Sequence, residues 1–439
     1  MQKPNTIVIK RVTKVSNELN PNHGINGMSP TPSPKVLILE PYAGGHHGPY
    51  LHWMAAGLAE RGFHVTVLML PETVEHPSVR ALAKTAFKKG GGSLQVLGVS
   101  TPIPLPLDVA SGATALIRRE IAYWRLFRAW YKAYVDTMRP DVVYLPYLDY
   151  CLYAIGLYGS PFGNCPWVGL AMRPSFHYRS MGVLAPRPAL AGVKEALFSR
   201  VLRNRYLRQL LTIDEPLASY LSDRWRASDK ASFFPEPAEF GGMPTPDEAK
   251  RQFGMAQERK LILLYGAVTA RKGVVELLRA LSAPGFPSVV DVLLAGKVAD
   301  PVIQEMLAEC WVRVLCDAGR LKIIDRFIEP AEEPALFAAA DIVWVGYRRH
   351  YNASAILVQA ASAGRPLLAC EDGVLGWQTR RRGLGRTVNP VDRAEVAAVV
   401  SALLDEQMDK PVNIRRADVW CPPSFSEAQD ALAHALVGA

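Results

Sequence analysis

Short apolar strands alternate with amphipathic helices along most of this chain, and that alternation constrains the fold more than any other feature. The first strand is "KVLILE" at 35–40, and a helix follows it. In that helix Leu51, Met54 and Leu58 recur at helical spacing before the next strand, "HVTVLML", begins. Strands joined by helices run parallel and are covered on both faces. The sequence therefore predicts an α/β protein built from doubly wound sheets.

The alternation occurs twice, on either side of a stretch rich in proline and glycine. "PEPAEFGGMPTPDEAKRQFG" contains four prolines and three glycines, as a linker does. With 439 residues the chain is long enough for two cores. We expect two Rossmann-like domains facing a cleft, with ligands at the carboxyl ends of the strands. The predicted parts are a flexible leader at 1–34, an N-terminal domain at 35–235, a C-terminal domain at 236–423 and a last helix at 424–439 that packs back on the N-terminal domain. Within the leader, "TIVIKRV" can form an edge strand.

The chain carries more positive than negative charge. It has 50 Lys and Arg against 41 Asp and Glu, and the resulting net charge of +9 suits an anionic partner. Two stretches, 117–135 and 193–211, mix basic and aromatic residues. Peripheral contact with a membrane is one interpretation of them, and burial against the sheet is the other. No apolar run reaches the roughly 20 residues of a spanning helix. We expect a cytoplasmic protein, with association at the cytoplasmic face of a membrane as an extension of that prediction.

The loop after the first strand has the composition of a ligand-binding turn. "PYAGGHHGPY" joins the strand to its helix and includes Gly44, Gly45 and His47. Glycines let backbone N–H groups approach a ligand, and a helix start favours an anion. The loop is not the Gly-x-Gly-x-x-Gly of dinucleotide-binding proteins. His47 is a candidate for the reaction centre, and capping of the helix is the structural alternative.

A basic turn opens the second series. "LLYGAVTARKGVVELLRAL" runs from a buried strand through Arg271 and Lys272 into a helix. Adjacent cations at a helix start bind anions because side-chain charge and backbone dipole act together. The sequence predicts a pyrophosphate site here, and a solvated basic turn is the alternative.

A later helix runs into another buried strand, in "NASAILVQAASAGRPLLA" at 352–369. The amides near Ala355 and the hydroxyl of Ser354 are positioned to bind a phosphate. Farther along, Gln359 can present its amide to hydroxyl groups. Packing within the helix is the alternative role for Gln359.

These motifs together resemble the glycosyltransferases of GT-B fold, in particular retaining glycosyltransferase family 4. The resemblance rests on "YGAVTARKGVVELLRAL", "AADIVWVGY", "LVQAASAGRPLLA" and "GLGRTV" in the second half, and on "AGGHHGPYLHWMAAGLAERGFHV" in the first. It implies that the C-terminal domain binds a nucleoside-diphosphate sugar and that the N-terminal domain binds an acceptor.

Carried over residue by residue, the resemblance makes Lys272 the phosphate-binding lysine, with Arg271 in place of an arginine that the family has earlier in the turn. The family's two acidic residues fall on Tyr351 and Gln359, so both carboxylates are missing. A glutamine can still donate to and accept from ribose hydroxyls. Nucleotide binding is therefore expected to survive, whereas the identity of the sugar is in doubt.

The family also places a histidine near the transferred sugar. His177, in "GLAMRPSFHYR", is an off-register candidate for that position, and His47 competes with it. No Asp-x-Asp metal motif occurs, and the six cysteines lack metal-binding spacing, so we expect neither a metal nor another cofactor. No nucleic-acid-binding module is recognised, and nucleic acid is not an expected partner.

The sequence thus predicts a hexosyltransferase-like enzyme that moves a sugar from a nucleoside-diphosphate sugar to an acceptor, with retention. Synthesis of a cell-surface polysaccharide or glycolipid is the predicted setting, and a lipid-linked acceptor suits the basic stretches. Two alternatives stay open. One is a non-catalytic relative that binds a nucleotide sugar or a partner enzyme. The other is a different chemistry on the same fold, inverting transfer or epimerisation, in which His47 or His177 acts as a base.

Overall fold

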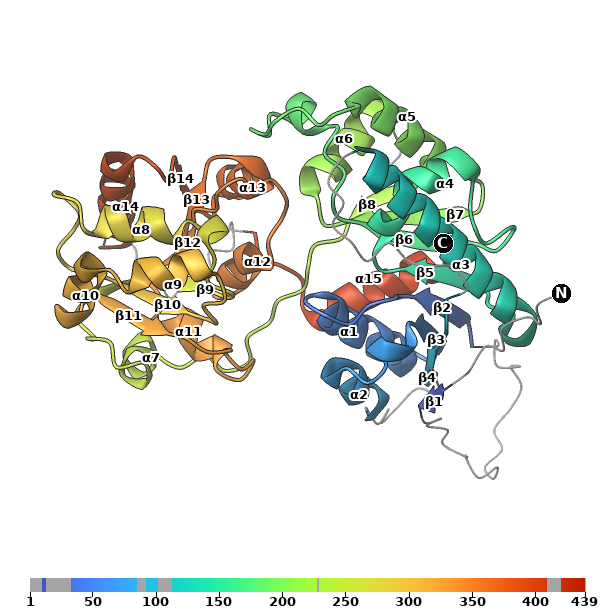
Figure 1. Ribbon diagram of the computed structural model, residues 1–439, viewed down its shortest axis with the longest axis horizontal. Coiled ribbons are helices and arrows are strands. Elements are labelled where there is room, and N and C mark those ends of the chain that lie inside the picture. Colours follow the sequence, from blue (N-terminus) through green and yellow to red (C-terminus); the bar gives the residue numbers. More distant parts are fainter. Residues whose placement is uncertain are drawn as a thin grey trace, which may run out of the picture. The chain divides into compact units, whose positions relative to one another are not determined.

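The computed structural model describes residues 10–12, 33–84, 92–101, 113–226, 229–408 and 420–438. The chain forms two compact units, each with a central sheet between helices (Figure 1). The first unit comprises Met1–His177, Arg187–Pro235 and Phe425–Ala439, and the second comprises Tyr178–Pro186 and Glu236–Ser424. The segment Tyr178–Pro186 therefore packs with the second unit, although its place in the sequence puts it in the first.

An eight-stranded sheet lies at the centre of the first unit. Its order is β1-β4-β3-β2-β5-β6-β7-β8, and only the edge pair β1–β4 is antiparallel. The strands are β1 (Lys10–Val12), β2 (Lys35–Leu39), β3 (His64–Met69), β4 (Ser93–Gly98), β5 (Val142–Leu145), β6 (Trp167–Ala171), β7 (Leu207–Thr212) and β8 (Ala231–Phe233). The edge strand β1 belongs to the predicted "TIVIKRV" segment.

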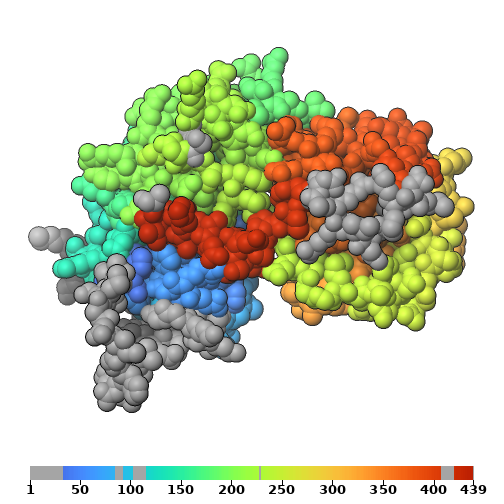
Figure 2. Space-filling view, turned by 180° about the vertical axis from the view of Figure 1, so that it is seen from behind, coloured from blue at the N-terminus to red at the C-terminus, as the bar shows by residue number. Residues whose placement is uncertain are grey.

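Helices cover both faces of this sheet. One face carries α1 (His47–Glu60), α2 (Pro77–Lys84) and α15 (Phe425–Val437), and the other carries α3 (Ala113–Met138), α4 (Leu152–Tyr158) and α5 (Ala191–Leu202). The helix α6 (Glu215–Trp225) packs against β7 and β8. Arg61, the C-cap residue of α1, donates to Asp430 on α15 over 2.6 Å. Figure 2 shows α15, in dark red, lying across the surface of the first unit.

Residues 193–211, the second of the two basic and aromatic stretches, form a helix and a strand. The first part belongs to α5 and the second to β7. Between them the Oδ1 of Asn204 accepts from the backbone N–H of Tyr206 over 2.9 Å, which fixes a turn. Leu207 and Leu210 are fully buried because β7 pairs with β6 and β8 inside the sheet. The second part of the stretch, in β7, therefore follows the interpretation of burial in the sheet and is not part of an interfacial helix.

A six-stranded parallel sheet lies at the centre of the second unit, in the order β11-β10-β9-β12-β13-β14. Its strands are β9 (Lys260–Tyr265), β10 (Val290–Ala295), β11 (Leu321–Ile324), β12 (Ile342–Val345), β13 (Leu367–Cys370) and β14 (Gly385–Val388). One face carries α8 (Val274–Leu281), α9 (Pro301–Leu307), α10 (Cys310–Asp317) and α14 (Arg393–Met408), and the other carries α7 (Pro246–Gln252), α11 (Glu333–Ala339) and α12 (Ala355–Ser362). The predicted doubly wound α/β fold is confirmed.

Two details of the second unit differ from the sequence-based expectation. The sequence from about Pro301 to Cys316 has the pattern of a single helix, but it forms two helices, α9 and α10, which Ala308 and Glu309 separate. The helix α13 (Gly373–Arg382) was not predicted, because its two glycines and its run of arginines conceal any apolar periodicity. None of the described helices combines the length and apolar character needed to span a bilayer. All six cysteines are free.

Candidate functional site

In each sheet the path of the chain reverses at the centre. In the first unit β2 leads outwards through β3 and β4, and the chain then returns to the other side of β2 at β5. In the second unit β9 leads through β10 to β11, and the chain returns beside β9 at β12. At such a reversal the loops after adjacent strands diverge and leave room for a ligand at the carboxyl ends. Apart from His177, which follows β6, the predicted site residues follow these central strands, β2 in the first unit and β9 and β12 in the second.

The turn after β9 holds a buried lysine. Lys272 is 8% exposed, and its Nζ donates to the carbonyl oxygen of Tyr265. The same Nζ lies 5.6 Å from the centre of the Tyr347 ring, a cation–π contact. Gly266 has a φ of +93°, and a Cβ at that position would lie 2.5 Å from Nζ. The absence of a side chain at position 266 therefore leaves the space that the ammonium group of Lys272 occupies.

Two cations meet in this turn. Burial and the neighbouring charge of Arg271 lower the pKa of Lys272 to about 8. Nη1 of Arg271 lies 2.9 Å from Nδ1 of His350, and burial and Arg271 also lower the pKa of that imidazole. No carboxylate pairs with either cation within the described ranges. A bound anion would relieve both the burial cost and the mutual repulsion of the two charges.

The start of α12 shares a tyrosine with this turn. Ser354 is the N-cap, and its Oγ accepts from the backbone N–H of Ile356 over 3.4 Å, so the hydroxyl caps the helix that Ala355 begins. The Tyr347 side chain hydrogen-bonds with Ser354 and also contacts Lys272. The structure thus brings the predicted donor-binding residues Lys272 and Ser354 to one buried tyrosine.

Gln359, one turn farther along α12, contacts a carboxylate that sequence reasoning missed. Its Nε2 donates to Oε2 of Glu333 over 3.0 Å, and the hydroxyl of Tyr265 donates to Oε1 over 2.5 Å. Burial raises the pKa of Glu333, and the two hydrogen bonds act against that rise. The one signal in the sequence was Pro334, which marks a helix start and places Glu333 in the first turn. Nothing local signalled the pairing with Gln359.

The segment Tyr178–Pro186 lies against the starts of α12 and α13. The hydroxyl of Tyr178 donates to Oδ1 of Asn352 over 3.2 Å, and Nε1 of Trp377 donates to the carbonyl oxygen of Met181 over 2.8 Å. The backbone N–H of Gly373 donates to Leu184 over 2.7 Å. This segment thus completes the second unit beside the predicted donor-binding loop.

In the first unit a buried carboxylate follows β2. Glu40 is 1% exposed, and its Oε2 lies 3.3 Å from Nδ1 of His47. Its Oε1 accepts from the hydroxyl of Tyr150 over 3.0 Å. Because Nδ1 faces the carboxylate, Nε2 remains for another partner. A Cβ on Gly44 or Gly45 would meet nothing within 4 Å, so the loop beside His47 has open space.

The neighbours of His47 keep this loop polar and aromatic. The rings of His46 and His47 stack with centroids 4.3 Å apart. Burial, His47 and Arg173 together lower the pKa of His46 to about 4, so His46 is neutral at physiological pH. The guanidinium of Arg173 lies 5.2 Å from the centre of the Tyr147 ring. Asp149 accepts from the backbone N–H of Arg173 over 2.9 Å and so fixes the loop after β6.

His177, the other predicted catalytic residue, lies inside the first unit. Its side chain is 0% exposed, and Nε2 lies 3.2 Å from Oδ1 of Asp214, which is also the N-cap of α6. Aromatic rings of Phe176 and Tyr220 surround it. A side chain with no exposed surface presents no atom to a substrate in this conformation. Its catalytic role stays a prediction, and the geometry assigns it a packing role.

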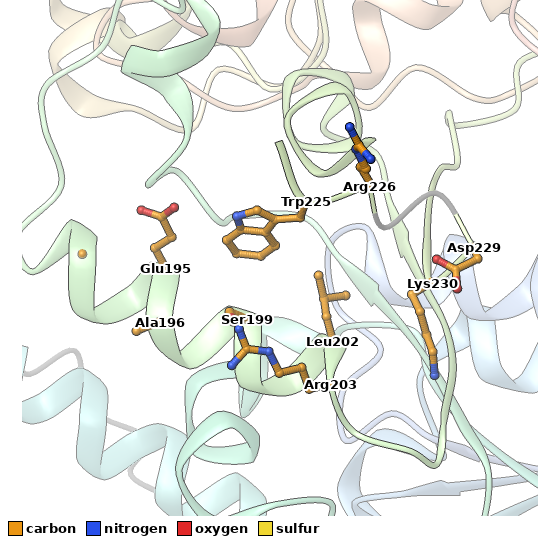
Figure 3. Close-up of a pocket in the computed structure, with 10 residues that line it drawn as sticks. Glu195, Ala196, Ser199, Leu202, Arg203, Trp225, Arg226, Asp229 and Lys230 are labelled. Atoms are coloured by element: carbon orange, nitrogen blue, oxygen red, sulfur yellow. The ribbon is translucent and has the colours of Figure 1, made fainter. Parts of the chain in front are cut away.

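A pocket with a volume of about 580 Å³ lies elsewhere on the first unit (Figure 3). One wall is a face of α5, and the ring of Trp225 projects towards it from the end of α6. The pocket lies near the amino ends of β7 and β8, whereas parallel sheets bind ligands at their carboxyl ends. None of the predicted site residues lines it; its lining consists of Gly192, Glu195, Ala196, Ser199, Leu202, Arg203, Trp225, Arg226, Asp229 and Lys230.

Comparison with known proteins places this arrangement among solved folds. No family model matches the sequence, and no curated protein is detectably similar to it. The match to sucrose-phosphate synthase from Thermosynechococcus elongatus covers 92% of this chain and 95% of that protein, at a TM-score of 0.58 and 16% sequence identity. The match to HepE from Anabaena, solved in complex with UDP, covers 92% of this chain and 96% of that protein, at a TM-score of 0.58 and 14% sequence identity. The chain has the GT-B fold.

WaaG, a glycosyltransferase involved in lipopolysaccharide biosynthesis, has the same fold. The match covers 92% of this chain and 100% of WaaG, at a TM-score of 0.52 and 15% sequence identity. The predicted resemblance to GT-B glycosyltransferases is thereby confirmed at the level of the fold. Membership of retaining family 4 stays a prediction.

Proposed function

We propose that this GT-B protein is a glycosyltransferase that moves a sugar from a nucleoside-diphosphate sugar to an acceptor. The observation that carries the proposal is the buried ammonium group of Lys272 next to Arg271, at the carboxyl end of β9, with no carboxylate paired to either among the described residues. A diphosphate supplies the missing negative charge. Anabaena HepE, which shares the fold, has been solved with UDP and with UDP-glucose, and this supports a nucleotide sugar as the ligand.

The chemistry requires stabilisation of a departing diphosphate. When the bond between sugar and diphosphate breaks, negative charge grows on the leaving oxygen. Lys272 and Arg271 would neutralise that charge, and the loss of one such donor typically costs about 3–4 kcal/mol in transition-state stabilisation. In a retaining transfer the leaving diphosphate can itself take the proton of the acceptor, so no protein nucleophile is needed. Metal independence is part of this proposal.

Inversion is a second candidate for the stereochemical outcome. It needs a general base, and the contact between Glu40 and Nδ1 of His47 favours one. A carboxylate at Nδ1 fixes the tautomer and stabilises the imidazolium that forms when Nε2 accepts a proton. The first unit would then supply both the acceptor site and the base. Proton NMR of the product, read at the anomeric position, separates the two outcomes.

The acceptor is proposed to be a growing polysaccharide or a lipid-linked sugar, reached by peripheral contact with a membrane. Support comes from the start of α3, where Leu116 and Ile117 are 48% and 52% exposed beside Arg118 and Arg119. Apolar side chains next to cations suit the interface of an anionic bilayer. Flotation with anionic and with neutral vesicles tests this part separately.

The function is tested first by thermal-shift measurements with UDP, GDP, ADP and CMP and their sugar derivatives. A ligand that binds only the folded state raises the melting temperature, and at equal concentration a tighter ligand raises it more. We expect one base to stand out. Stabilisation by none of them would contradict the proposal, and transfer or hydrolysis of the stabilising donor would exclude the non-catalytic alternative.

A further inference from the structure

The site in the second unit contains a carboxylate that no motif assigns. Glu333 begins α11, its Oε1 accepts from the hydroxyl of Tyr265, and its Oε2 accepts from Nε2 of Gln359. The carbonyl oxygen of Tyr265 in turn accepts from Lys272. One residue at the end of β9 therefore holds both the buried cation and the carboxylate.

The carboxylate has unused hydrogen-bonding capacity. A carboxylate offers about four lone-pair positions, and the contacts with Tyr265 and Gln359 use one on each oxygen. Glu333 is only partly buried, so the others remain reachable. One free acceptor position on each of two adjacent oxygens matches a pair of hydroxyl groups on neighbouring carbon atoms. The nucleoside half of a nucleotide sugar carries such a pair on its ribose.

We propose that Glu333, held by Tyr265 and Gln359, recognises the ribose diol of the nucleotide and so makes the site selective for ribonucleotides. This inference rests on the proposed function. The contact also explains the amide at position 359. A second carboxylate at hydrogen-bond distance from Glu333 would repel it, whereas the amide N–H₂ of Gln359 donates to it. The resemblance implies a carboxylate at position 359 on α12. Here the carboxylate lies on α11 instead, at Glu333, and Gln359 on α12 donates a hydrogen bond to it.

The test is calorimetric titration of the full chain with UDP and 2′-deoxy-UDP, or with the matching pair for whichever base the thermal-shift panel selects. The unaltered protein should prefer the ribonucleotide by roughly 10-fold or more, the usual effect of a hydrogen bond to a charged group. Glu333→Gln should lower that preference to about 3-fold or less, with little change in affinity for the deoxynucleotide. Glu332→Gln, whose carboxylate pairs with Arg326 instead, is the matched control and should keep the preference.

A charge-swap variant separates recognition from a structural role. Glu333→Gln combined with Gln359→Glu restores one carboxylate and one amide in exchanged positions, so it should recover most of the ribonucleotide preference. Gln359→Glu alone should weaken binding because it brings two carboxylates together. Thermal unfolding of each variant checks folding, and Glu333→Asp, which keeps the charge, replaces Glu333→Gln if the latter does not fold.

The outcomes are distinct. Binding of no nucleotide by the unaltered protein would remove the proposed function and this inference together. Binding with an unchanged ribonucleotide preference in Glu333→Gln, or with equal losses for both nucleotides, would overturn this inference and leave the proposed function standing.

Discussion

The Oε2 of Glu40 lies 3.3 Å from Nδ1 of His47, at the carboxyl end of the central strand β2. The same carboxylate accepts from Tyr150 and from the backbone N–H of Tyr42 over 3.1 Å. These donors keep a buried carboxylate in place, and the carboxylate orients the imidazole. The His47 side chain is 16% exposed, so its second nitrogen is left for another partner, whereas the His177 side chain has no exposed surface in this conformation.

Replacement of His47 by alanine should reduce turnover far more than nucleotide affinity. General-base catalysis typically contributes 10²–10⁴-fold, so a fall in kcat of about that size is expected if the product is inverted. A retaining transfer would leave measurable activity, with a fall nearer 10-fold. Steady-state kinetics together with the anomeric configuration of the product decide between the two, and an unchanged kcat would remove His47 from the reaction centre.

The affinity for a diphosphate should fall as the pH rises through about 8. The pKa of Lys272 is lowered to about 8, so in the free protein the ammonium charge is complete below that pH and is lost above it. A bound anion favours the charged form and raises the pKa, so binding above pH 8 should take up a proton. Calorimetry in buffers with different ionisation enthalpies measures that uptake. Lys272→Arg should flatten the dependence, and an unchanged slope in that variant would contradict the assignment.

The turn that carries Lys272 should not tolerate a side chain at Gly273. Gly273 has a φ of +71°, and a Cβ there would lie 2.1 Å from the carbonyl oxygen of Gly346. Gly285 is the matched control, because its φ is +85° but a Cβ would meet nothing within 4 Å. Alanine at either position costs about 1–2 kcal/mol in backbone strain, and the clash at Gly273 should add about 1–3 kcal/mol. Chemical denaturation measures both, and equal losses would contradict the close approach.

The stability of the first unit should fall as the pH rises from about 4.5 to 7, because the buried carboxyl group of Glu120 loses its proton. Oε2 of Glu120 accepts from the backbone N–H groups of Tyr153 and Ala154, over 2.8 and 3.0 Å, at the start of α4. Burial raises the pKa of Glu120 from 4.5 to about 7. The folded state therefore holds the proton more tightly than the unfolded state does, so the stability present below pH 4.5 is lost as the pH rises to 7.

Glu120→Gln keeps the acceptor oxygen and removes the buried charge. We expect it to raise the unfolding free energy on the order of 1 kcal/mol at about pH 8 and to change it little at about pH 4. Thermal unfolding at the two pH values measures the difference. A variant that is less stable at both would show that the carboxylate charge strengthens the cap of α4.

The fold was predictable because its signals are local. Each buried strand reads as a short apolar run, and the glycines and cations at Gly44, Gly45, Arg271 and Lys272 stand directly after such runs. Since the carboxyl ends of the central strands bind ligands, the order of elements alone placed these turns at one edge of each sheet.

The features that could not be read from the sequence depend on packing between distant segments. Glu333 and Gln359 are 26 residues apart, and their contact depends on how α11 and α12 pack on one face of the sheet. His177 also follows a buried strand, but it turns inwards because Asp214, at the start of α6, accepts from it there. In 193–211 the leucines fit both helical and strand spacing, and pairing with β6 and β8 decided the strand.

The most direct test of the central claim, that Lys272 binds the diphosphate of a nucleotide sugar, is calorimetric titration of the unaltered protein and Lys272→Ala with a nucleoside diphosphate and with the free nucleoside. The buried cation should matter for the phosphates alone, so Lys272→Ala should weaken the diphosphate by roughly 10- to 100-fold and leave the nucleoside nearly unchanged. Equal losses for both ligands would contradict the account.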